Sequence, residues 1–182
     1  MESRARIFGH SLHQILIVFP LGLLTTSVGF DLLGAFTGDA RWPATSFYVT
    51  IVGLLGGVAA AVFGLVDYLA IPRGTRAKRV GLWHGLSSAV LLGMFAVSGW
   101  LRMSDPSVVH TGALAVSLLG LATAGIAGWL GGELVNRMGV GVADDANLDA
   151  RGKPGGRATP SGSTGTLSPG APLHRAAGRP AG

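Results

Sequence analysis

Four long, mostly apolar stretches constrain this chain more than any other feature; they lie at about 12–36, 45–71, 80–101 and 108–133. About 20 apolar residues in a helix span the hydrocarbon core of a bilayer, so each stretch is long enough to cross a membrane. The stretches are too long for barrel strands and lack a strict alternation of apolar and polar residues. The sequence therefore predicts an all-α fold, a four-helix transmembrane bundle.

The composition supports a membrane protein. Of the 182 residues, 48% are hydrophobic and only 13% are charged, which is unusual for a water-soluble domain. Cysteine is absent, so disulfides and thiolate metal sites are excluded, and histidine and carboxylate are left as the strong metal ligands. The net charge of +5 comes from basic residues spread over loops and the C-terminal part. We therefore expect a lipid bilayer, and no nucleic acid, as the partner.

The basic residues also predict an orientation. Segment 72–79 has no acid and several basic residues, namely Arg73, Arg76, Lys78 and Arg79. The other two loops balance Arg41 with Asp39 and Arg102 with Asp105. By the positive-inside rule segment 72–79 faces the cytoplasm, and an even number of spans then places both termini there as well. The first stretch is longer than the apolar part of a signal peptide, so we expect it to be retained as a span.

The composition changes abruptly at residue 144. Asp144, Asp145 and Asp149 are followed by a run rich in Gly, Pro, Ser, Thr and Arg with almost no large apolar residue. Such a run cannot bury enough apolar surface to fold. We expect a four-span membrane domain over 1–143 and a disordered polar tail over 144–182, either solvated and dispensable or an arm for anionic lipid or a partner.

Small residues recur at every fourth position in the second and fourth stretches. The rows are Gly53, Gly57 and Ala61; Gly56, Ala60 and Gly64; and Gly120, Ala124, Gly128 and Gly132. Small residues at this spacing let helix backbones approach closely, which is how helices associate in lipid. The rows predict tight packing inside the bundle, with a homo-oligomer formed through one row as the alternative.

Ionisable residues in membrane spans are costly and mark candidate functional sites. On the expected topology, each span places one candidate near its cytoplasmic end: His13, Asp67, His84 and Glu133. His10, three residues before His13, is expected on the same helix face and is a substitute ligand. Two histidines and two carboxylates are the ligand set of a divalent metal site, and a pair of facing histidines is what haem b requires.

The same residues also have a purely structural interpretation, because polar residues belong at helix ends. Asp67 would then pair with Arg73 or Arg76, and Glu133 with Arg137 four residues later. Both interpretations remain open at this point.

Two further residues lie deeper in the first span. Asp31 is on the same helix face as His13 but near the opposite, outer side of the membrane. Pro20, between them, lacks a backbone donor and predicts a kink that frees the carbonyl of Leu16. A proton or ion path along this face is one hypothesis; ordinary helix packing is the other.

Several segments carry a resemblance to a known family. Residues 9–22 read GHSLHQILIVFPLG, residues 128–135 read GWLGGELV and residues 139–142 read GVGV, with Phe30-Asp31, Gly64-Leu65-Val66-Asp67 and His84-Gly85 between them. Together they resemble the bacterial four-helix membrane family catalogued as domain of unknown function 2231. The resemblance implies a four-helix bundle in the bacterial inner membrane.

The resemblance also bears on the first histidine. In that family the first helix often opens with a His-Pro-x-x-(Val/Ile)-x-Phe-Pro pattern, sometimes with a second histidine just before Phe-Pro. Here His13 matches the first histidine, Gln14 replaces the proline and Val18 stands at the second histidine's place. Some relatives look fused to Rieske-type iron–sulfur domains, which implies a membrane redox context and a redox partner.

Two functional hypotheses follow. The first is a redox-associated protein that binds haem b or a metal through His13 and His84, with Asp67, Glu133 and His10 as further candidates. The second is a non-catalytic structural or accessory subunit of a membrane complex. The sequence has no nucleophile elbow, phosphate-binding loop or triad spacing, so we do not expect an enzyme.

Overall fold

The computed structural model describes residues 1–148 and 150, so most of the expected tail lies outside the described residues. The helices of this part are α1 (Leu12–Leu16), α2 (Val18–Thr37), α3 (Arg41–Ala70), α4 (Arg76–Leu101) and α5 (Thr111–Asn136). A short antiparallel pair of strands precedes them, β1 (Arg6–Ile7) and β2 (His10–Ser11). Since α1 and α2 together form one span, Leu12–Thr37, the described chain has four candidate membrane spans, and the predicted all-α bundle is confirmed.

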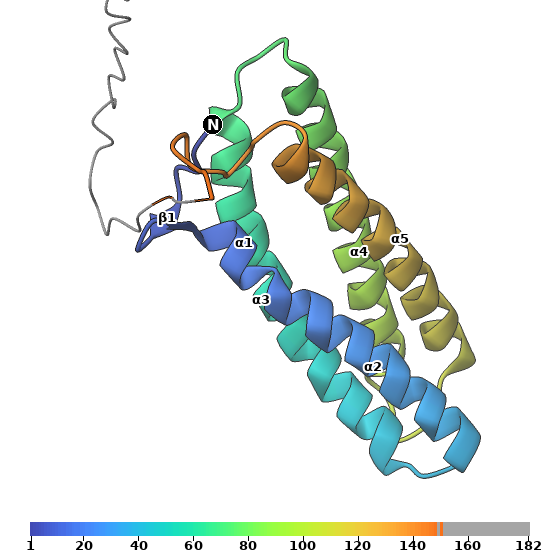
Figure 1. Cartoon of the computed structure of the whole chain (residues 1–182). Coiled ribbons are helices and arrows are strands. Elements are labelled where there is room, and N and C mark those ends of the chain that lie inside the picture. The colour runs from blue at the N-terminus through green and yellow to red at the C-terminus, as the bar shows by residue number, and fades with distance from the viewer. Residues whose placement is uncertain (149, 151–182) are drawn as a thin grey trace, which may run out of the picture.

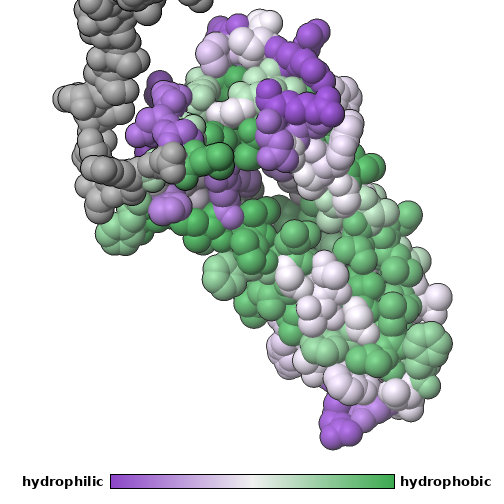
Figure 2. All heavy atoms as spheres, viewed as in Figure 1, coloured by the Kyte–Doolittle hydropathy of each residue, from purple (hydrophilic) through white to green (hydrophobic). Residues whose placement is uncertain are grey.

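The outer surface of the helices is suited to lipid. In Figure 2 a green, apolar band covers the visible face of the helices and separates purple, polar regions at the two ends of the bundle. Large apolar side chains such as Phe19, Leu55, Leu69 and Trp129 are more than half exposed in this band. Soluble monomeric proteins rarely expose so large a continuous apolar surface. The chain is therefore a multi-pass membrane protein.

The four spans form two helical hairpins. α2 packs along α3, and α4 packs along α5 (Figure 1). Small residues make this close packing possible, because a Cβ on Gly53 would lie 2.8 Å from Leu24, and one on Gly120 would lie 2.9 Å from Phe95. Leu24, Phe95 and Val28 form the buried core. These two glycines of the small-residue rows thus serve packing within the chain.

The two hairpins repeat each other in sequence and in contacts. Asp31 and Arg102 are 71 residues apart, and the same separation relates three further pairs: His13 and His84, Leu24 and Phe95, and Ser27 and Ser98. In α3 and α5, the second helices of the two hairpins, equivalent residues are separated by slightly fewer positions. These pairs are Gly53 and Gly120, Ala60 and Ala127, and Gly64 and Gly131. Since α2 and α4 run in the same direction, an approximate two-fold axis along the bundle relates the two hairpins.

Local sequence signals set the helix ends. Thr75 caps α4, because its hydroxyl accepts a hydrogen bond from the backbone N–H of Lys78 at 3.1 Å. α2 ends at Gly38, which has the left-handed φ of 68° that glycine adopts without strain. Pro20 cannot donate to the carbonyl of Leu16, and the helix is divided into α1 and α2 at Ile17, three residues before Pro20.

Two names describe the ends of the bundle. The terminal end holds residues 1–11, the connection between α3 and α4, and the chain after α5; the loop end holds residues 38–40 and 102–110 (Figure 1). The candidate site lies between the two hairpins, on the side of the terminal end.

Candidate functional site

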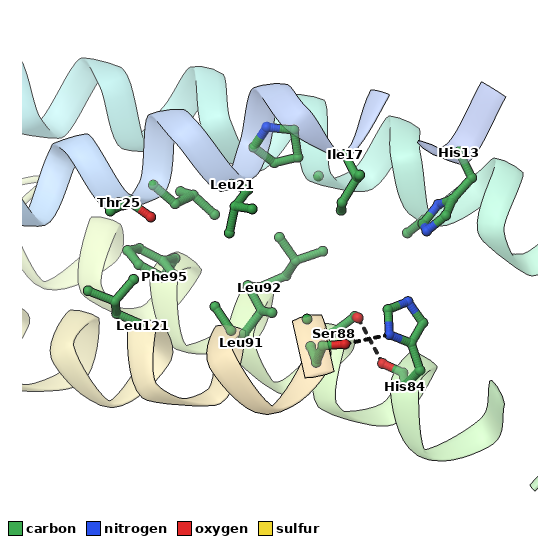
Figure 3. Close-up of a pocket in the computed structure, with 17 residues that line it drawn as sticks. His13, Ile17, Leu21, Thr25, His84, Ser88, Leu91, Leu92, Phe95 and Leu121 are labelled. Atoms are coloured by element: carbon green, nitrogen blue, oxygen red, sulfur yellow. Dashed lines mark hydrogen bonds between the residues drawn. The ribbon is translucent and has the colours of Figure 1, made fainter. Parts of the chain in front are cut away.

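His13 of α1 and His84 of α4 face each other between the two hairpins (Figure 3). The centroids of their rings are 6.1 Å apart, and the ring planes are nearly perpendicular, at 89°. The two residues hold equivalent positions of the repeat, so the approximate two-fold axis passes between them. Of the sequence-predicted candidates, these two are brought together.

Backbone carbonyls of α3 and α5 orient the two histidine rings. Nδ1 of His13 donates to the carbonyl of Ala60 at 2.8 Å, and Nδ1 of His84 donates to the carbonyl of Ala127 at 2.9 Å. A carbonyl only accepts, so Nδ1 carries the proton, and in the neutral ring Nε2 keeps its lone pair. Metal-binding histidines are typically held in this way, with one nitrogen fixed by a hydrogen bond and the other available as a ligand.

Glycine makes each of these hydrogen bonds possible. The residue one turn after Ala60 is Gly64, and the residue one turn after Ala127 is Gly131. A Cβ on Gly64 would lie 2.8 Å from Nδ1 of His13, and one on Gly131 would lie 3.2 Å from Cε1 of His84. The absence of these two methyl groups lets each ring reach the carbonyl beside it.

An apolar cavity of about 110 Å³ extends from the histidine pair between the hairpins. Its lining follows the repeat: Gly57 and Ala124 are equivalent, as are Ala61 and Gly128, and Leu21 and Leu92. Figure 3 shows Leu21 and Leu92 between the two layers of helices. The small residues on α3 and α5 leave space for the cavity, and its lining is almost entirely apolar.

The carboxylates expected at this site are engaged elsewhere. Asp67 binds the N-terminal segment, accepting hydrogen bonds from the hydroxyl of Ser3 at 2.7 Å and from the backbone N–H groups of Arg4 and Ala5 at 2.8 and 3.3 Å. The expected pairing of Asp67 with Arg73 or Arg76 is not found among these contacts. Asp67 instead holds residues 3–5 against the end of α3.

Glu133 pairs with basic residues at the surface. Its carboxylate lies 3.0 Å from Nε of Arg137, as the structural interpretation predicted, and 3.7 Å from Arg76. Over residues 1–148 and 150, no three His, Asp or Glu side chains come together as metal ligands. The set of His13, Asp67, His84 and Glu133 is therefore not assembled as one site.

His10 lies apart from His13. It belongs to β2, is exposed, and its Nδ1 donates to the carbonyl of Phe8 at 3.1 Å. The expectation that the two histidines share a helix face is wrong, because the helix begins only at Leu12, after the strand pair.

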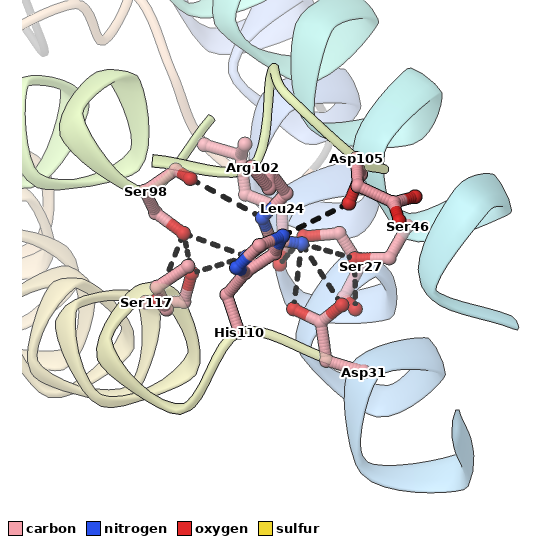
Figure 4. Close-up of polar contacts among 10 residues, drawn as sticks. Leu24, Ser27, Asp31, Ser46, Ser98, Arg102, Asp105, His110 and Ser117 are labelled. Carbon is pink, nitrogen blue, oxygen red and sulfur yellow. Dashed lines mark hydrogen bonds and ion pairs between the residues drawn. The ribbon is translucent and has the colours of Figure 1, made fainter. Parts of the chain in front are cut away.

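A second polar cluster surrounds Arg102, near the loop end of the bundle. Arg102 is only 3% exposed and Asp31 2%, and Nη1 of Arg102 lies 2.8 Å from the Asp31 carboxylate (Figure 4). The guanidinium also donates to the hydroxyls of Ser46, Ser98 and Ser117, at 3.0, 2.6 and 3.3 Å.

Arg102 thus turns into the bundle, away from the loop that it shares in sequence with Asp105. Asp105 accepts hydrogen bonds from the hydroxyl and from the backbone N–H of Ser107, which lower the pKa of the Asp105 carboxyl. The signal that would have found Arg102 is its place in the repeat, equivalent to Asp31.

The two polar clusters are separated by apolar side chains. Leu24, Val28 and Phe95 form the buried core between the histidine pair and the Asp31–Arg102 pair. Pro20 is buried and lines the cavity without a polar group to offer. In the described part of the chain, the expected path from His13 past Pro20 to Asp31 is thus interrupted by apolar packing.

Comparison with known proteins agrees with this architecture. A family model described as "Predicted membrane protein (DUF2231)" matches residues 9–144, which include all four spans and both polar clusters. No curated protein and no solved structure matches the chain. On the strength of a match that covers well over half of its length, the chain belongs to the family of domain of unknown function 2231.

Proposed function

We propose that this protein binds haem b between its two hairpins, with His13 and His84 as the two axial ligands. The observation that carries the proposal is the facing pair of histidines, 6.1 Å apart between ring centroids, with both Nδ1 atoms bound to carbonyls. The protein would serve as an electron carrier in a redox system of the bacterial inner membrane, with both termini in the cytoplasm. The basic connection at 72–79 supports that orientation.

The spacing of the rings would let His13 and His84 both hold one metal ion. In each ring Nδ1 is bound to a carbonyl, so Nε2 is the nitrogen that would bind it. The centroids of the two rings are 6.1 Å apart. The two-fold repeat supports the same conclusion, because each hairpin offers one identical ligand held in the same way.

Haem suits this ligand set better than a divalent ion does. A structural zinc ion takes four ligands, and other divalent ions take more. Asp67 and Glu133 are bound to the N-terminal segment and to arginines, which leaves two nitrogen ligands. The macrocycle of a haem supplies four of its own, so two histidines complete the coordination.

The rest of the site suits a flat, apolar group. Haem held by two histidines transfers single electrons and has no open position for a substrate. The carbonyls of Ala60 and Ala127 fix the orientation of the two histidine rings. Small residues beside the rings leave space for such a group, namely Gly57, Ala61, Ala124 and Gly128. A porphyrin is larger than the cavity of about 110 Å³, so binding requires Leu21 and Leu92 to turn aside.

A structural or accessory subunit is the second candidate. The observation that favours it is that Asp67 and Glu133 both stabilise helix ends, which is what that interpretation predicts. In that case the rings of the two histidines would join the hairpins by packing alone, while their hydrogen bonds hold the helices within each hairpin together.

Haem content separates the two candidates. The full chain is purified in mild detergent from cells supplied with haem precursor, and the haem per chain is measured as its pyridine complex. We expect about one haem per chain in the wild type and less than a tenth of that in His13→Ala and His84→Ala. His10→Ala and His110→Ala are the matched controls, since both histidines lie outside the pair, and they should keep the wild-type content.

Two outcomes would overturn the proposal. One is a wild-type chain that neither carries haem nor takes up added hemin at a fixed ratio. The other is full haem content in the His13→Ala/His84→Ala double variant. Intact partner binding in that double variant would then favour the accessory subunit.

A further inference from the structure

The hairpin of β1 and β2 presents apolar side chains to its surroundings. Its strands pair Arg6 with Ser11 and Ile7 with His10, so Phe8 and Gly9 form the turn. Phe8 is 84% exposed and Ile7 45%. The tip therefore exposes apolar surface next to the polar terminal end of the bundle.

The backbone of the turn holds the phenyl ring outward. Phe8 has a φ of 48° and Gly9 a φ of 85°, so both turn residues are in the left-handed region. A two-residue hairpin turn of this kind favours Asn or Gly, and a bulky residue at its first position is strained. Strain at an exposed aromatic residue indicates a function for that side chain.

The position of the hairpin identifies the partner as lipid. The hairpin projects sideways from the start of α1 in Figure 1, at the level where polar colouring gives way to apolar colouring in Figure 2. Its apolar tip is followed in the same span by the exposed, lipid-facing residues Ile15, Val18 and Phe19. Aromatic and apolar residues at this depth anchor proteins in the interface of the bilayer.

The charges near the hairpin suit an anionic leaflet. Arg4 and His10 are exposed, and Arg6 pairs with Glu2. A basic residue close to the membrane surface is attracted to anionic lipid, while the apolar tip enters the region of the acyl chains.

We infer that the hairpin Arg6–Ser11 is an interfacial anchor, which inserts Ile7 and Phe8 below the headgroups of the leaflet at the terminal end. α1 starts directly after Ser11 and carries His13 in its first turn. The anchor would therefore fix the depth of the helix that supplies one histidine of the pair. The inference does not depend on haem binding.

The chain has no cysteine, so a single cysteine can be labelled at any chosen position. Three full-length variants, Phe8→Cys, Val18→Cys and Arg73→Cys, are spin-labelled and reconstituted in bilayers of phosphatidylethanolamine and phosphatidylglycerol. Val18 is 65% exposed on the apolar band and is the lipid reference, and Arg73 in the connection after α3 is the water reference. Collision rates with oxygen, which dissolves in lipid, and with a water-soluble nickel chelate are measured by electron paramagnetic resonance.

We expect the label at residue 8 to resemble the label at residue 18, with a ratio of oxygen to nickel collisions several-fold above that at residue 73. A ratio at residue 8 equal to that at residue 73 would overturn the inference. A label that is exposed to nickel in these bilayers but shielded from both reagents in native membranes would also overturn it, because a protein partner would then cover the tip.

Discussion

Asp31 and Arg102 occupy equivalent positions of the two hairpins, 71 residues apart, and form a buried ion pair at 2.8 Å. The pair joins α2 to the end of α4. The guanidinium also donates hydrogen bonds to three serine hydroxyls, one each from α3, α4 and α5. All four spans thus meet at this one side chain, at the end opposite the histidine pair. The cluster fixes the hairpins to each other where the cavity does not separate them.

Breaking this ion pair should destabilise the bundle strongly. Arg102→Leu leaves the Asp31 carboxylate buried without its partner, at a cost of about 3–5 kcal/mol. Asp31→Leu/Arg102→Leu removes both charges and should recover much of the loss. The thermal unfolding midpoint in detergent measures the effect, with Arg41→Leu in the exposed loop pair as the control. A double variant less stable than Arg102→Leu would contradict this account.

Exchanging the two charges tests the repeat itself. In Asp31→Arg/Arg102→Asp, the new arginine would stand one turn after Ser27, as Arg102 stands one turn after Ser98. A terminal guanidinium nitrogen of the new arginine would reach Thr50, which is equivalent to Ser117. The hydroxyl of Thr50 is buried in this structure without a hydrogen bond to the described residues. We expect the exchanged protein to unfold at a temperature above either single reversal, Asp31→Arg or Arg102→Asp. Equal instability of all three would contradict the equivalence.

Methyl groups beside the histidines should damage the site. Gly64→Ala places a Cβ 2.8 Å from Nδ1 of His13, and Gly131→Ala places one 3.2 Å from His84, so the first ring must shift further. We expect haem content to fall several-fold in Gly64→Ala and less in Gly131→Ala, with overpacking of about 1–3 kcal/mol. Gly85→Ala is the control, because nothing lies within 4 Å of its added Cβ. If Gly85→Ala lost as much haem as Gly64→Ala, ring displacement would not be the cause.

Removing the charge of Asp67 should loosen the N-terminal segment without emptying the site. Asp67→Asn weakens the hydrogen bonds to Ser3, Arg4 and Ala5, which are charge-assisted in the wild type. We expect faster amide hydrogen exchange over residues 3–11 and unchanged haem content. Ser3→Ala, which removes one donor, should give a smaller increase in exchange. Loss of haem in Asp67→Asn alone would instead make Asp67 part of the site.

The spans could be predicted because apolar length is a strong signal, and the rows at Gly53 and Gly120 correctly indicated close packing. The ends of helices were less accurate: the third span begins at Arg76 and not at 80, because Thr75 caps a polar first turn. His13 and His84 were found from their common depth. The depth of a residue follows from its distance to the helix end, which the sequence provides.

Other residues depend on contacts that helix periodicity does not specify. The partners of Asp67 and the position of His10 depend on the first eleven residues, whose strand pair and turn have no periodic signal. Arg102 follows a helix end, so its place in the sequence indicated a loop and gave no sign that the side chain is buried. Only the spacing of the repeat connects it to Asp31, and comparing the two halves of the sequence would have shown it.

The absorption spectrum of the purified, full-length protein tests the central claim most directly. The account predicts a Soret band in the isolated protein and, in the reduced-minus-oxidised difference spectrum, the sharp α and β bands of a low-spin haem with two nitrogen ligands. Both should disappear in His13→Ala and His84→Ala and remain in His10→Ala. A wild-type protein with no Soret band, even after addition of hemin, and with no iron at a fixed ratio to the chain would contradict the account.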